Sequence, residues 1–75
     1  MRRAGTVVRL AQGLIVVRAA GSDHADIGAS LVDETLADVG RVVDVFGPVE
    51  APYLAVTTDS DVHPPTLLGE PLYLR

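Results

Sequence analysis

Glycine and proline divide this chain into short segments that are rich in β-branched residues. Seven Gly and five Pro are spread over 75 residues, and no amphipathic pattern with the helical period of about 3.6 residues develops between them. β-Branched and aromatic side chains favour extended backbone, whereas glycine and proline interrupt strands. The sequence therefore predicts an all-β fold made of short strands.

Six segments carry the strand pattern. The six span residues 5–11, 13–19, 29–34, 39–47, 52–58 and 69–75. The chain must turn between the first two at Gln12-Gly13 or their neighbours, as in a tight hairpin. Successive strand residues alternate between faces, so Leu31 and Val32 are expected to face opposite sides, and Leu72 and Leu74 to share one. Closing the sheet protects its edges, which predicts one domain over residues 1–75, folded as a small six-stranded antiparallel barrel.

Charge argues against direct nucleic-acid binding. Ten acids oppose six bases, all of them Arg, which gives a net charge of −4 and a pI near 4.8. An acidic domain without Lys is poorly suited to phosphate contacts, and its Asp excess resembles the composition of proteins adapted to high salt. The alternative is that five arginines converge on one face and contact RNA: Arg2, Arg3, Arg9, Arg18 and Arg41.

The absence of cysteine excludes disulfide scaffolds and thiolate zinc sites, and it favours a cytoplasmic location. The longest apolar run, 14–17, is far below the roughly 20 residues of a membrane span. Behind the basic start Met-Arg-Arg-Ala-Gly there is no apolar segment, so no signal peptide is expected.

Catalytic and metal-binding patterns are weak. Both histidines fall in predicted polar loops and the acids are scattered among turns, so no nucleophile or acid–base pair is predicted. The run Asp59-Ser60-Asp61 resembles part of a calcium loop but lacks its glycine and distal glutamate. His24 with Asp23 and Asp26 is a second possible ligand set. Solvated acidic loops explain both, so we expect no metal, no cofactor and no enzymatic activity.

The stretch RVVDVFGPVEAPYLAV, residues 41–56, holds the single Phe, one of two Tyr, and two Pro four residues apart. Because large side chains are few, Phe46 is expected to fill the core. Val49 lies between Pro48 and Pro52 at the tip of a predicted hairpin. A stiff, partly apolar loop loses little entropy on docking, so the tip is a candidate protein interface.

The arrangement of these segments resembles the GAR subunit of H/ACA ribonucleoprotein particles in its archaeal form. The run Asp44-Val45-Phe46-Gly47-Pro48-Val49, followed three residues later by Pro52-Tyr53, is its most specific part. The Gly/Arg-rich tails of eukaryotic members and the long flanks of a related assembly factor are absent from the sequence. The matching positions are Gly5, Val7, 13–17, 31–33, 39–53 and 67–73.

The resemblance implies a barrel similar to the second domain of translation factors, with no activity of its own. Such a subunit binds the catalytic domain of the pseudouridine synthase, away from the guide RNA. It influences a mobile loop that grips substrate RNA, and so promotes substrate loading and product release in rRNA pseudouridylation. The alternatives are a direct RNA-binding barrel and the related H/ACA assembly factor. The interface is expected at Gly47, Pro48, Val49, Pro52 and Tyr53, with Leu14 on the nearby hairpin as a lesser candidate.

Overall fold

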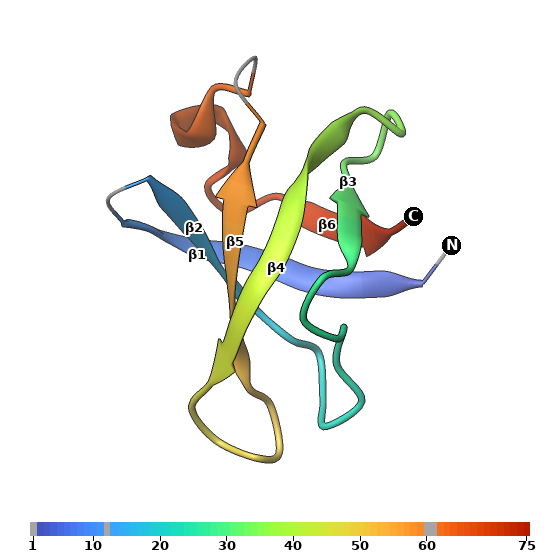
Figure 1. Cartoon of the computed structure of the whole chain (residues 1–75), viewed down its shortest axis with the longest axis vertical. Coiled ribbons are helices and arrows are strands. Elements are labelled where there is room, and N and C mark those ends of the chain that lie inside the picture. The colour runs from blue at the N-terminus through green and yellow to red at the C-terminus, as the bar shows by residue number, and fades with distance from the viewer. Residues whose placement is uncertain (1, 12, 60–61) are drawn as a thin grey trace.

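The computed structural model describes residues 2–11, 13–59 and 62–75 and confirms the all-β barrel (Figure 1). Its elements are β1 (Arg3–Ala11), β2 (Leu14–Arg18), β3 (Ser30–Val32), β4 (Asp38–Phe46), β5 (Tyr53–Thr58), the 3₁₀ helix η1 (Pro64–Leu67) and β6 (Pro71–Leu74). The strands close in the order β1-β2-β5-β4-β3-β6, and every neighbouring pair is antiparallel. No helix within the described ranges has the length and apolar character needed to cross a membrane.

The core is built from the inward-facing residues of all six strands, which are mainly Val and Leu. Burying one such side chain contributes about 1.5–3 kcal/mol, and the described residues bury no polar side chain to offset this. Leu72 is fully buried and Leu74 packs against the same core, as the alternation predicts. The fully buried residues include Val7, Ile15, Val17, Leu31, Val42, Leu54, Val56 and Leu72.

Gly40 allows β4 and β5 to approach each other closely. It pairs with Thr58, and a Cβ atom at this position would lie 1.6 Å from the backbone oxygen of Thr57. Any other residue would therefore push the two strands apart. Since β4 and β5 form one of the seams that close the barrel, this glycine is a requirement of the fold.

Phe46 does not lie in the core, and the prediction that placed it there is wrong. Its side chain is 46% exposed. The cause is a β-bulge at Val43: Val42 pairs with Val56, but the next pair is Asp44 with Ala55. One extra residue reverses the alternation of everything that follows in the strand, so Phe46 points outward.

Both apolar residues of β3 are buried, on opposite faces of the strand. Leu31 belongs to the core cluster and pairs with Leu74, which packs against the same core. Val32 pairs with Tyr73, which alternates with the inward Leu72 and Leu74 of β6, so its side chain lies on the other face, as the alternation predicts. The register against β4 shifts between the two residues, from Gly40 to Asp38.

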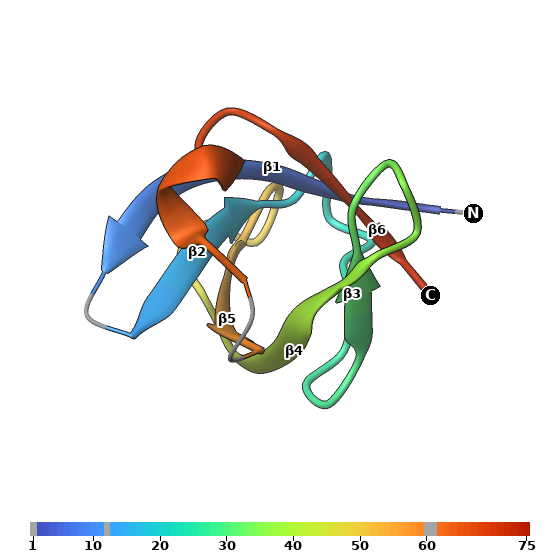
Figure 2. The ribbon, with the colours of Figure 1, turned by 90° about the horizontal axis from the view of Figure 1, so that it is seen from above.

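The segment expected as a polar loop before β6 contains the 3₁₀ helix η1, which lies at the opposite end of the barrel from the β4–β5 loop (Figures 1 and 2). Two prolines begin it, and a first turn tolerates proline because its N–H groups have no partner inside the helix. Leu67 at its end is buried and belongs to the core cluster. Of the predicted Gln12-Gly13 turn, Gln12 lies outside the described residues.

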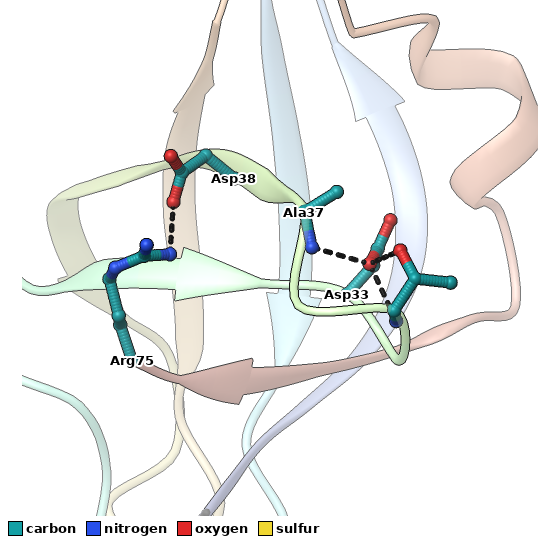
Figure 3. A network of polar contacts seen from close by, with 5 residues as sticks. Asp33, Ala37, Asp38 and Arg75 are labelled. Carbon is teal, nitrogen blue, oxygen red and sulfur yellow. Dashed lines mark hydrogen bonds and ion pairs between the residues drawn. The ribbon is translucent and has the colours of Figure 1, made fainter.

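Asp33 organises the turn between β3 and β4 (Figure 3). Its Oδ1 atom accepts hydrogen bonds from the hydroxyl of Thr35 at 2.6 Å, from the N–H of Thr35 at 2.8 Å and from the N–H of Ala37 at 3.1 Å. The hydrogen bond from the Thr35 hydroxyl lowers the pKa of the Asp33 carboxyl, and the two N–H groups act in the same direction. Desolvation of the carboxyl opposes them but does not cancel the effect. An ion pair between Asp38 and Arg75 ties the end of β6 to the start of β4.

Candidate functional site

The loop that joins β4 to β5, residues 47–52, projects from one end of the barrel, at the bottom of Figure 1. Val49 at its tip is 83% exposed, and Pro48 beside it is also exposed. Ser22 and His24, from the segment that links β2 to β3, line the same hollow as this loop. The tip therefore presents apolar side chains to solvent, as an interface would.

The base of this loop is fixed. Gly47 has a φ of +90°, and a Cβ atom there would lie 2.7 Å from Cδ2 of the Tyr53 ring, so only glycine fits. At the other side of the loop, Pro52 is buried and its carbonyl oxygen accepts the N–H of Ala19 at 2.9 Å. A loop held in this way has little freedom to lose on binding.

Phe46 and Tyr53 are cross-strand neighbours whose rings stack on the outside of the barrel. Their centroids are 5.6 Å apart and the ring planes meet at 28°. The pair forms one side of a shallow depression on the outer face of β1, β2, β5 and β4. We call it the outer groove; it is lined by Val8, Arg9, Val16, Arg18, Phe46 and Tyr53.

Sequence reasoning missed most of the outer groove. Alternation along β2 could have shown that Val16 and Arg18 share a face, because Ile15 and Val17 are the inward residues. The contribution of Phe46 could not have been found in this way, since it depends on the bulge at Val43.

Leu14 is not brought together with the loop. It begins β2 and pairs with Ala11 and Thr57, whereas Arg18 at the other end of β2 pairs with Tyr53. At about 3.3 Å per residue, Leu14 lies roughly 13 Å along the strand from the row that contains Tyr53. The other five predicted interface residues lie on the loop or at its base.

The five arginines do not all converge. Arg3 donates to the Thr6 hydroxyl at 3.0 Å, and Thr6 pairs with Arg18, so Arg3, Arg9 and Arg18 share the outer face of β1 and β2. Arg2 pairs instead with Asp23 at 3.5 Å. Arg41, on β4, lines a separate polar hollow with Arg75.

The weak metal patterns do not form a cluster. His24 donates from Nδ1 to the carbonyl oxygen of Ala25 at 2.9 Å, and Asp23 is engaged by Arg2. Across residues 2–11, 13–59 and 62–75, no three His, Cys, Asp or Glu side chains gather as they would around a metal ion. Ser60 and Asp61, in the calcium-like run, lie outside the described residues.

Comparison with known families gives the barrel its context. The family model described as the Gar1/Naf1 RNA binding region matches residues 1–75. The chain belongs to the Gar1/Naf1 family. No curated protein matches the sequence.

Gar1/Naf1 membership confirms the resemblance drawn from the sequence and gives the chain an H/ACA-related RNA-binding role. Gar1 domains are non-catalytic accessory parts of ribonucleoprotein particles. Membership therefore associates the chain with H/ACA particle components and RNA.

Proposed function

We propose that this chain is a non-catalytic accessory subunit of an H/ACA particle that binds the pseudouridine synthase through the β4–β5 loop. Gly47, Pro48, Val49, Pro52 and Tyr53 form the docking site, in which Val49 supplies the exposed contact and the other four fix its position. Leu14 is excluded from the site because it lies at the far end of β2.

The observation that carries this proposal is the exposure of Val49, 83%, on a loop with a fixed base. Covering this valine with a partner removes apolar surface from water, which favours docking. The fixed base means that docking orders little new backbone, so more of the contact energy appears as affinity.

Docking of this kind influences catalysis only if the partner's states differ in their contact with the barrel. A mobile loop of the synthase could contact the barrel more closely in its substrate-releasing state than in its substrate-gripping state, or the reverse. Binding of the barrel would then shift the loop toward the state with the better contact. Substrate loading and product release then respond to the subunit although the barrel performs no chemical step.

Val49→Asp tests the proposal. The substitution places a charge where an apolar contact forms, so we expect the chain to stop co-purifying with the synthase while its circular dichroism spectrum stays unchanged. Leu36→Asp is the matched control, because Leu36 is 58% exposed in the turn at the opposite end of β4. Retention of binding by Val49→Asp would rule out the loop as the docking site.

A second experiment separates this function from direct RNA binding. We expect guide RNA alone, titrated against the isolated chain, to bind weakly and to gain affinity only when the synthase is present. Tight binding by the chain alone, with a steep dependence on salt, would favour the RNA-binding barrel instead. Because the matched family includes Naf1, co-purification from mature particles distinguishes a resident subunit from an assembly factor.

A further inference from the structure

The outer groove lies beside the proposed docking loop and is continuous with it. Phe46 lines both the groove and the hollow around the loop. The apolar surface therefore runs from Val49 at the tip, across the stacked Phe46 and Tyr53 rings, to Val16 and Val8 on the neighbouring strands. A partner segment bound at the tip can therefore extend its apolar contact into the outer groove.

Two bulges shape this groove. The bulge at Val43 turns Phe46 outward, and a bulge in β1 does the same for Arg9: Val7 pairs with Val17, but the next pair is Arg9 with Val16. If Val8 took a regular place in the ladder, strict alternation from the buried Val7 would direct Arg9 into the apolar core. Bulges commonly re-aim side chains at the edges of functional sites, and here two of them supply residues to one face.

The charge of the groove is opposite to that of the chain. The net charge is −4, yet the groove is lined by two guanidinium groups and no carboxylate. Within the part of the chain that the structure describes, the ion pairs involve Arg2 and Arg75 rather than Arg9 or Arg18. The two groove arginines are thus free to meet an acidic ligand.

The loop alone is too small for a stable interface. Specific complexes bury roughly 800 Å² on each partner, which is about a fifth of the 4511 Å² that this chain exposes. Six loop residues with a buried proline among them do not provide that area. A stable contact must extend beyond the loop, and the adjoining outer groove is the apolar surface that can supply it.

We propose that the outer groove is the second half of the docking surface and that it takes a segment of the partner protein in which an apolar side chain is flanked by carboxylates. The apolar side chain covers Val8, Val16 and the aromatic pair. The carboxylates meet the guanidinium groups of Arg9 and Arg18, which favour planar, bidentate acids. This inference rests on the proposed function, since it gives the partner of the β4–β5 loop a second point of contact.

A protein segment fits the groove better than single-stranded RNA. Bases bind such proteins by stacking on free aromatic faces above a basic track. Here Phe46 and Tyr53 stack on each other, and two arginines on a chain of net charge −4 would meet only a short run of phosphates. Asp44, which pairs with Ala55 on the same side of the sheet, would repel a continuing backbone.

Calorimetry with the intact chain and the synthase subunit tests the inference. Arg9→Gln and Arg18→Gln each remove a charged hydrogen-bond donor that contributes about 1.5–3 kcal/mol, so we expect each to weaken binding by tenfold or more and to flatten its salt dependence. Arg41→Gln is the matched control, because it removes the same charge from an exposed site outside the groove; it should leave affinity within about twofold of wild type.

The outcomes separate this inference from the proposed function. If Val49→Asp abolishes binding while Arg9→Gln and Arg18→Gln behave like Arg41→Gln, the loop docks the synthase and the groove does not contribute. If Val49→Asp binds as wild type, the proposed function itself fails. If the groove variants keep their affinity for the synthase but lose affinity for a fluorescent single-stranded oligoribonucleotide, the groove is an RNA site and the inference is overturned.

Discussion

Replacing Gly47 with alanine tests whether the aromatic pair depends on the glycine beside it. The substitution introduces two penalties. The φ of +90° lies in the left-handed region, where a side chain costs about 1–2 kcal/mol. The new Cβ atom would also stand 2.7 Å from Cδ2 and 3.3 Å from Cε2 of Tyr53, so the ring must leave its stacked position, which forfeits about 0.5–1.5 kcal/mol of aromatic interaction.

Gly28→Ala isolates the second penalty. Gly28 has a φ of +94° and no atom within 4 Å of its added Cβ, so its substitution carries the backbone penalty alone. The gain from a stiffer unfolded chain is common to both variants and cancels. We expect Gly47→Ala to be less stable than Gly28→Ala by about 1 kcal/mol, which corresponds to about 4–8 °C in Tm for a domain of this size.

Urea unfolding followed by far-UV circular dichroism measures both free energies, and near-UV spectra report on the aromatic pair. The Gly47→Ala spectrum should lose part of its aromatic signal while the Gly28→Ala spectrum matches wild type. Equal destabilisation by the two substitutions, with unchanged near-UV spectra, would refute the argument that Gly47 is required by the Tyr53 ring.

Two further predictions concern the barrel itself. Gly40→Ala forces a Cβ atom against the Thr57 carbonyl and should abolish the cooperative unfolding transition. Gly21→Ala is the control: its added Cβ atom would have nothing within 4 Å, so the free energy of unfolding should hardly change. A cooperative transition in Gly40→Ala would contradict the close approach of β4 and β5. Because the folded-state pKa of Asp33 is lowered by Thr35, its carboxylate stabilises the fold above the unfolded pKa of about 3.9, and this stabilisation is lost as pH falls through the folded pKa. Asp33→Ala should therefore flatten the pH dependence of the unfolding free energy below about pH 4, and an unaltered slope would show that another group causes it.

The strands were predictable because their signals are local. Glycine, proline and β-branched residues mark where extended segments begin and end, and all six expected strands are present. The facing of Phe46 was not predictable, because a bulge is defined by the residues of the opposite strand. Val43 becomes the extra residue only when Val42 and Asp44 pair with consecutive residues of β5.

The candidate site was predictable in part for the same reason. The stiff loop around Val49 follows from Pro48 and Pro52, which act on their own neighbourhood. The distance of Leu14 from that loop follows from the antiparallel register of β2 with β5, which a reading along the chain does not contain. The outer groove is formed by residues of four strands, so it could not be predicted from any one segment of the sequence.

The two bulges decide how the groove responds to a change in the length of the chain. Deleting Val43 would leave Val42 opposite Val56 and Asp44 opposite Ala55, so β4 would lose its extra residue while Phe46 stayed outward; deleting Val8 would leave Arg9 opposite Val16 in the same way. Inserting one residue between Asp44 and Phe46 would instead shift the alternation and send Phe46 inward. During divergence, the bulges are therefore the places where β1 and β4 can lose a residue without exchanging their inner and outer faces.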